Sequence, residues 1–134
     1  MDKCAISWKD ICATAEQLEV DPCAVKAVCQ VESLGAGFLE SGRPKIPLEG
    51  PILWKKLREH GEDPERHAAA HPNVVYRKWD RRQYKGGEAE HTRLEEACAI
   101  HRCAALESAS WGTFQIMGFN YPACGYENVE NFVE

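Results

Sequence analysis

The sequence has no apolar run long enough to span a membrane, and residues 1–8 lack the apolar core of a secretion signal peptide. We therefore predict a protein that is made in the cytoplasm and has no membrane partner. Positive charge is also scarce, because 16 lysine and arginine residues stand against 21 aspartate and glutamate residues, a net charge of −5. This balance argues against a general nucleic-acid binder, which normally presents an excess of basic residues.

Metal-binding patterns are missing as well. The seven cysteines include no Cys-x-x-Cys pair, and only Cys98 and His101 stand at a spacing that suits metal ligands. The sequence therefore predicts no metal site and no cofactor. Cys12, Cys29 and Cys98 recur at helical spacings among apolar residues, where a reduced thiol behaves as a small hydrophobe. We expect most of the cysteines to be free thiols, and a disulfide framework is the alternative.

The period-two alternation of a β-strand is almost absent, whereas helical periodicity is frequent. A chain of 134 residues can build one core, so we predict a single, mainly α domain over residues 1–134. Its core should come from the first two helices and the helix that begins at a capping box at Thr92, with at most a short β-hairpin near Lys45–Leu48. The helices are predicted over residues 7–20, 21–33, 52–60, 64–70 and 92–106, and another begins at residue 129.

The helix predicted over residues 21–33 carries an unusual carboxylate. Asp21 can cap its first free amides, and Pro22 suits its first position. At about 100° per residue, Glu32 falls on the apolar side of this helix, near Val28. Burial raises the pKa of a carboxyl group, so Glu32 is a candidate general acid that could protonate the leaving oxygen of a glycosidic bond. The alternative is an ordinary helix-end carboxylate that points into solvent.

Glu107 shares these features. It also ends a predicted helix, is followed by a serine, and lies over Ile100 and Cys103. Glu107 could be the acid, with Glu32 structural. The interpretation that we favour is that Glu107 binds backbone amides near the turn into Trp111.

Residues 76–85 mix aromatic with basic side chains, and Asp80 is the single carboxylate among them. Such a mixture can bind nucleic acid, but the net charge and the lack of a recognised motif argue against nucleic acid as a partner. The mixture also suits an anionic glycan, because rings stack on sugars and cations attract peptide carboxylates. The remaining interpretation is a solvated charged face with its rings turned inward.

Residues 108–126 contain no charged side chain, yet three glycines and one proline interrupt them. The stretch is too polar and too broken for a membrane span. We interpret it as a buried wall with turns that lines a cleft.

Several segments resemble a known family. Val31-Glu32-Ser33 and the later Trp111–Gly118 segment resemble the Glu-Ser and Gly-x-x-Gln-Ile/Val motifs of lysozyme-like transglycosylases and goose-type lysozymes. The sequence is more similar still to the N-acetylmuramidase family of phage endolysins, over about residues 5–133. The matching motifs, in order, lie at residues 31–38, 42–46 with 48–50, 76–87 and 105–120.

The resemblance implies a mainly helical, lysozyme-like fold and cleavage of the β-1,4 bond between N-acetylmuramic acid and N-acetylglucosamine. Bacterial peptidoglycan would then be the partner of this chain. The catalytic glutamate of the family falls on Glu32, and Glu49 is implied to line the cleft. The resemblance places substrate-binding roles on Ser33, Ser110, Trp111, Gln115, Ile116 and Tyr121.

Two reaction outcomes stay open at this stage. Glu49 is the first candidate for a second carboxylate that activates water or acts as nucleophile. Alternatively, the 6-hydroxyl of the muramic acid attacks, which would make the protein a lytic transglycosylase. An endolysin of either kind would leave the cytoplasm through a holin or another export route.

The chain departs from the family pattern in its many cysteines and at Pro47 and Pro51, where an aromatic residue and a histidine are expected. The two prolines are expected to reshape the loop beside Glu49. The domain of the family also continues with further helices beyond the point that matches Glu134. A second functional hypothesis therefore stands beside the enzyme: an inactive peptidoglycan-binding or protein-interaction module on a truncated lysozyme-like fold.

Overall fold

The computed structural model describes residues 6–33 and 37–134, and they form two compact units. The smaller unit contains the described residues up to Lys45 together with Gly112–Gln115. The larger unit contains Ile46–Trp111 and Ile116–Glu134. None of the helices in the described ranges is long and apolar enough to cross a membrane.

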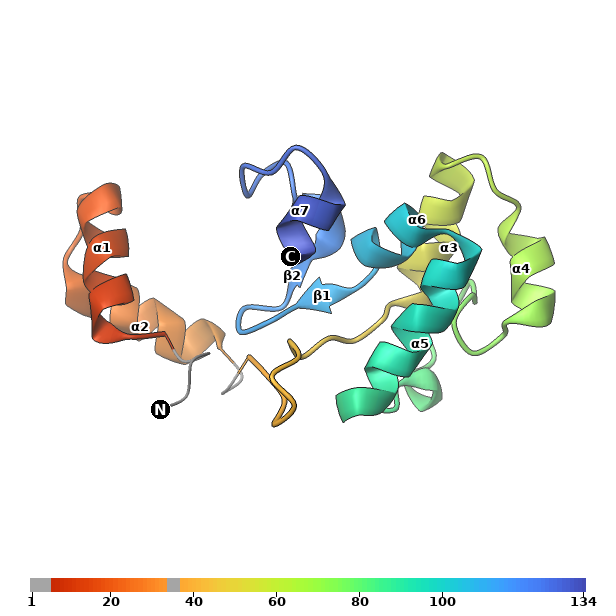
Figure 1. Ribbon diagram of the computed structural model, residues 1–134, viewed down its shortest axis with the longest axis horizontal. Coiled ribbons are helices and arrows are strands. Elements are labelled where there is room, and N and C mark those ends of the chain that lie inside the picture. Colours follow the sequence, from red (N-terminus) through yellow and green to blue (C-terminus); the bar gives the residue numbers. More distant parts are fainter. Residues whose placement is uncertain (1–5, 34–36) are drawn as a thin grey trace. The chain divides into compact units, whose positions relative to one another are not determined.

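Two helices that pack against each other make up most of the smaller unit (Figure 1). Helix α1 (Trp8–Leu18) begins at a capping box, in which Ser7 accepts from the amide of Asp10 and the Asp10 carboxylate accepts from the amide of Ser7. Helix α2 (Pro22–Glu32) begins where Asp21 accepts from the amide of Cys23 at 2.6 Å. Both helices confirm the prediction from local sequence signals, within one or two residues at each end.

A loop over residues 37–45 completes the smaller unit together with residues 112–115. Lys45 donates its amide to the carbonyl of Gly37 at 2.8 Å and accepts the amide of Gly112 at 3.0 Å. Glycine is required at position 37, because a Cβ there would lie only 2.1 Å from Oγ1 of Thr113. The loop and the 112–115 turn are therefore joined by backbone contacts rather than by a buried core.

The larger unit contains the remaining elements and the main hydrophobic core. Its fully buried residues include Leu48, Leu53, Leu57, Val74 and Val75. The core cluster draws its members from residues 46–129. The expected core is therefore partly correct, because the helix predicted over residues 92–106 contributes Leu94 and Ala97, whereas the first two helices contribute no residue to this cluster. The elements are α3 (Gly50–Glu59), α4 (Pro64–Ala70), η1 (Arg81–Gln83), α5 (Gly87–Ile100), α6 (Arg102–Glu107), β1 (Ser110–Trp111), β2 (Ile116–Met117), η2 (Gly118–Asn120) and α7 (Val129–Val133).

The helix predicted over residues 92–106 is in fact two helices, and Thr92 lies inside the first of them. Helix α5 begins at Gly87, five residues before the expected capping box. The chain leaves the helical conformation at His101, where φ is −158°. His101 then caps α6, because its Nδ1 accepts from the amide of Ala104 at 3.2 Å. A histidine acting as a helix cap was not foreseen from the sequence.

The antiparallel hairpin is present, but not where it was expected. Strands β1 and β2 pair Ser110 with Met117 and Trp111 with Ile116. Near the predicted position the structure has isolated bridges, between Phe38 and Pro44 and between Leu48 and Ala109, rather than a hairpin. Prolines at positions 44, 47 and 51 explain the difference, since proline has no N–H to donate to a strand ladder.

The six cysteines in the described residues are free thiols, while Cys4 lies outside those residues. We therefore expect the denatured, non-reduced protein to contain at least six titratable thiols per chain. A colorimetric thiol count in denaturant measures this number, and the same protein after reduction is the control. Three disulfide bonds would leave one thiol among the seven cysteines and would contradict the expectation.

Candidate active site

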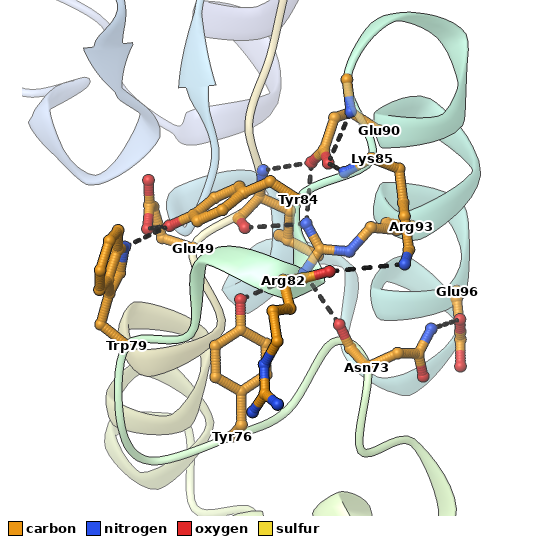
Figure 2. Close-up of polar contacts among 12 residues, drawn as sticks. Glu49, Asn73, Tyr76, Trp79, Arg82, Tyr84, Lys85, Glu90, Arg93 and Glu96 are labelled. Atoms are coloured by element: carbon orange, nitrogen blue, oxygen red, sulfur yellow. Dashed lines mark hydrogen bonds and ion pairs between the residues drawn. The ribbon is translucent and has the colours of Figure 1, made fainter.

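Glu49 immediately precedes α3, at the helix N-cap position, but its carboxylate does not cap the helix. Its Oε2 instead accepts a hydrogen bond from the hydroxyl of Tyr84, 35 residues away in the chain. The Tyr84 oxygen in turn accepts the indole N–H of Trp79 at 3.0 Å, and Figure 2 shows the hydroxyl between Trp79 and Glu49. The backbone amide of Glu49 donates to the carbonyl of Ser108 at 2.9 Å. Glu49 is thus held through both its backbone and its side chain.

The Tyr84 hydroxyl is partly buried beside a carboxylate. Burial is the main cause that raises the pKa of Tyr84, and the hydrogen bond and negative charge of Glu49 raise this pKa further. The Trp79 indole, which donates to the hydroxyl oxygen, acts weakly in the opposite direction. Tyr84 therefore remains a hydrogen-bond donor to Glu49 well into the alkaline range.

A buried ion pair on α5 holds the backbone just before Glu49. The side chains of Glu90 and Arg93 are only 2% and 4% exposed, and their charged atoms lie 2.9 Å apart. Glu90 Oε2 accepts the amide of Leu48 at 3.0 Å, and the Arg93 guanidinium donates to the carbonyl of Leu48 at 3.2 Å (Figure 2). Both polar backbone groups of Leu48 are therefore satisfied by side chains more than 40 residues away.

The same ion pair is connected to its surroundings by further hydrogen bonds. Glu90 Oε1 accepts the amide of Lys85 at 2.6 Å, while Arg93 also donates to the carbonyl of Asn73 and to the Tyr76 hydroxyl. Burial alone would raise the pKa of Glu90, but the amides and the Arg93 guanidinium outweigh it and lower the pKa below its ordinary value. Glu90 is therefore an ionised structural carboxylate.

Glycine is required directly after Glu49. A Cβ at Gly50 would lie 2.2 Å from Cε1 of Tyr76, so only glycine lets this ring pack against the start of α3. Pro51 follows within the first turn of α3, where a missing N–H is tolerated. The prolines that depart from the family pattern thus fit the local backbone, and the Pro47 carbonyl accepts the amide of Ser110.

Glu32 is the last residue of α2 and belongs to the smaller unit. The expectation that it is buried is wrong, because its side chain is exposed. Helix α2 has no buried residue, and Val28 and Val31 are 58% and 78% exposed. The apolar side of α2 lines an open apolar groove of about 560 Å³ with α1, so apolar periodicity did not imply burial here. Ser33 caps the helix, and its amide donates to the carbonyl of Cys29.

Gln115 stabilises the turn at residues 112–115 in the smaller unit. It has a positive φ of 50°, and its side-chain amide donates to the carbonyls of Gly112 at 2.8 Å and Lys45 at 3.1 Å. Gln115 therefore holds the turn against the 37–45 loop, which is a structural role that the sequence did not reveal.

The other predicted substrate-binding residues lie in the larger unit, around the hairpin. Ser110 is buried in β1, and the indole N–H of Trp111 donates to the carbonyl of Leu106 at 3.2 Å. Ile116 in β2 and Tyr121 after η2 are partly buried. The expected buried wall over residues 108–126 is only partly correct, since residues 108–110 are buried and residues 122–126 are exposed.

Glu107 binds a histidine rather than backbone amides. Its Oε2 lies 3.0 Å from Nε2 of His60, and the His60 ring lies 4.5 Å from that of His101. The expected contact with the turn into Trp111 is thus replaced by an ion pair or hydrogen bond that joins α6 to the end of α3.

The side chains of residues 76–85 are neither all turned into the protein nor all exposed to solvent. Tyr76 and Tyr84 are partly buried, whereas Trp79 is 64% exposed. Arg82 donates two hydrogen bonds to Asp80 at 3.0 Å, and these bonds lower the pKa of Asp80 to about 2. Arg81 is exposed and makes no such ion pair within the described ranges.

The described residues include no group of three or more histidine, cysteine, aspartate or glutamate side chains that could hold a metal ion. Among the predicted site residues, the structure groups Glu32, Ser33 and Gln115 in the smaller unit. It groups Glu49 with Ser110, Trp111, Ile116 and Tyr121 in the larger unit. Sequence reasoning missed Tyr84, Glu90 and Arg93 as partners of the Glu49 segment, because no local pattern links positions so far apart.

Comparison with known proteins gives a consistent result. The N-acetylmuramidase family model matches residues 21–134. The crystal structure of the Burkholderia AP3 phage endolysin is similar, with 43% sequence identity and a TM-score of 0.90. This match covers 99% of the present chain and 49% of the endolysin chain, so the present chain spans about half the length of that protein. A search of curated proteins gives no match. The fold is the mainly helical, lysozyme-like fold of an endolysin, as the motifs predicted.

Proposed function

The chain belongs to the N-acetylmuramidase family, and from this membership we propose that it degrades bacterial peptidoglycan, with residues 1–134 acting as one domain. The bond that we propose is the β-1,4 linkage between N-acetylmuramic acid and N-acetylglucosamine. The observation that carries this proposal is the family match over residues 21–134, which includes both Glu32 and Glu49. Like an endolysin, the protein would reach the wall from the cytoplasm through a holin or another export route.

We assign the general-acid role to Glu32. Its exposed carboxyl at the end of α2 is accessible to a large polymeric substrate. In the proposed reaction it protonates the leaving oxygen while an oxocarbenium-like state develops at the muramic acid ring. Glu49 is the proposed second carboxylate. The residues proposed to bind the glycan are Ser33, Ser110, Trp111, Gln115, Ile116 and Tyr121.

A turbidity assay on purified cell walls tests the proposal. Lysis by the wild-type chain supports the enzyme. Binding to the walls without any release of fragments would favour the alternative, an inactive peptidoglycan-binding module. The mass of the fragments then separates the two chemical outcomes, because transglycosylation leaves a muramic acid product that is lighter by one water than the hydrolysis product.

The exposed arginines of residues 76–85 are expected to contribute to wall binding. We predict that Arg81→Ala with Arg82→Ala weakens binding to cell-wall sacculi, and more strongly at low salt, because exposed charges are less screened there. Of the two single variants, Arg81→Ala should have the larger effect, since Arg82 is already paired with Asp80. Co-sedimentation with sacculi across a salt series measures this. Equal affinity for the double variant and the wild type at every salt concentration would assign these arginines to an ordinary solvated surface.

A further inference from the structure

We propose that Tyr84 and Trp79 are positioning residues that hold Glu49 as a proton acceptor, with Oε2 bound and Oε1 available to the substrate. This inference rests on the proposed muramidase function and assigns Glu49 the role of general base. Three features of the larger unit support it: the direction of a hydrogen-bond chain, the restraint on the Glu49 backbone, and the availability of one carboxylate oxygen.

The chain of hydrogen bonds from Trp79 to Glu49 has only one possible direction. The indole N–H of Trp79 can donate but cannot accept, so the Tyr84 oxygen must accept from it at 3.0 Å. The single hydroxyl hydrogen of Tyr84 is then left for Oε2 of Glu49, which must accept it. A proton on Oε2 would face this hydrogen and break the contact. The hydrogen bonds from Trp79 through Tyr84 therefore keep Oε2 of Glu49 as an acceptor.

The backbone is restrained at Glu49 and at the residue before it. Glu90 and Arg93 bind the amide and the carbonyl of Leu48, and Ser108 accepts the amide of Glu49 itself. With the backbone and Oε2 both fixed, the position of Oε1 is set as well. A reacting group that is held in this way avoids the entropy loss of being ordered during the reaction.

Oε1 of Glu49 has no hydrogen-bond partner among the residues that the structure describes. Glu49 is only partly buried, so a substrate group can approach this oxygen. The exposed Trp79 ring lies next to the Tyr84 hydroxyl (Figure 2), is held in orientation by its bond to Tyr84, and is suited to stack on a sugar ring. A general base must lie within hydrogen-bond reach of the proton that it takes, and a free oxygen on a carboxylate held at its other oxygen suits this role.

The proposed step balances without a cofactor. Oε1 of Glu49 takes a proton from a water molecule as the water oxygen bonds to the anomeric carbon. The glycosidic C–O bond breaks, its electron pair stays on the leaving oxygen, and that oxygen takes the proton of the general acid. Glu49 ends protonated and the general acid ionised, and exchange with solvent restores both groups. If the 6-hydroxyl of the muramic acid attacks instead, Glu49 takes the proton of that hydroxyl.

Tyr84→Phe tests the positioning role, because it removes the hydroxyl and keeps the ring. We expect kcat on solubilised peptidoglycan to fall about tenfold to a hundredfold, with little change in KM. This loss is smaller than the full contribution of general acid–base catalysis, which is about a hundredfold to ten-thousandfold. Trp79→Phe, which keeps a ring but loses the N–H, should cause a smaller loss of kcat. Tyr126→Phe is the matched control, since Tyr126 is exposed and distant in sequence from this chain of contacts.

A double-mutant cycle with Glu49→Gln separates positioning from general damage to the fold. If Tyr84 acts through Glu49, Tyr84→Phe should cause little further loss of kcat in the Glu49→Gln background. The same four proteins, unfolded by heat, should also show non-additive losses of Tm, which reports the contact without any need for activity. Multiplicative losses of kcat, full kcat in Tyr84→Phe, or a glycosyl ester trapped on Glu49 would each overturn the proposed role.

The cycle also distinguishes this inference from the proposed function. A wild-type chain that cuts no peptidoglycan would overturn the muramidase proposal and the base role together, even where the Tm cycle confirms the hydrogen bond. A wild-type chain that cuts, with additive effects of Tyr84→Phe and Glu49→Gln, would overturn the positioning role alone.

Discussion

Glu32→Gln should lower the lytic turnover of the chain by about a hundredfold to ten-thousandfold and leave the fold unchanged. The amide has nearly the same shape as the carboxyl group but cannot release a proton to the leaving sugar. Because the Glu32 side chain is exposed at the end of α2, its replacement removes no buried contact. Turbidity loss of purified walls measures the rate, and circular dichroism with thermal unfolding measures the fold.

Three further variants make this result specific. Glu40→Gln is the matched control, because Glu40 is another exposed glutamate of the smaller unit. Glu107→Gln should lower stability more than turnover, since it weakens the contact with His60. Glu49→Gln should reduce turnover as expected for a base. Full activity in Glu32→Gln together with lost activity in Glu107→Gln would reverse the assignment of the acid.

The largest effect on stability is expected from Glu90→Gln. Removing one partner of a buried ion pair leaves the other charge uncompensated, and such changes typically cost about 3–5 kcal/mol. In this protein the change would leave the Arg93 guanidinium, which is 4% exposed, without its carboxylate. A loss of this size is a large share of the stability of an ordinary domain. Urea unfolding at neutral pH measures it.

The control for this variant is Glu59→Gln, which removes an exposed carboxylate paired with Lys56 and should change the urea midpoint little. Equal midpoints for Glu90→Gln and the wild type would contradict the role of the buried pair. Because Leu48 is held by Glu90 and directly precedes Glu49, Glu90→Gln should also reduce turnover under conditions where the protein is still folded.

The pH dependence of stability follows from the direction of the Glu90 shift. The folded state lowers the pKa of Glu90 below its ordinary value of 4.5, so the ionised group favours folding above that pH. This contribution is lost as the pH falls from about the ordinary value through the folded pKa. We therefore expect Glu90→Gln to lose less stability than the wild type on acidification, which unfolding midpoints along a pH series would measure.

Local signals predicted most of the helices correctly. Helix α1 was predicted from helical periodicity, and α2 and α4 from the starts at Asp21-Pro22 and Asp63-Pro64; these signals relate residues a few positions apart, so they can be identified in the sequence. The family motifs could also be identified from the sequence alone, and the comparisons confirm the family that they indicated. The capping box at Thr92 was the exception, because Arg93, Leu94 and Glu95 are also good helix formers and the helix continues through Thr92 from Gly87.

The surroundings of the two glutamates depended on the tertiary structure. Helical periodicity placed Glu32 on the apolar side of α2, but burial also requires another element to cover that side, and the α2 side chains stay largely exposed. The contacts that hold Glu49 join it or its neighbour Leu48 to Tyr84, Glu90 and Arg93 across 35–45 positions of sequence. The sequence by itself therefore determined the helices, the family and the candidate carboxylates, because these depend on local spacing and motif order. Only the tertiary structure decided which carboxylate is exposed and which is held by a fixed hydrogen-bond network, because burial and long-range contacts arise from packing.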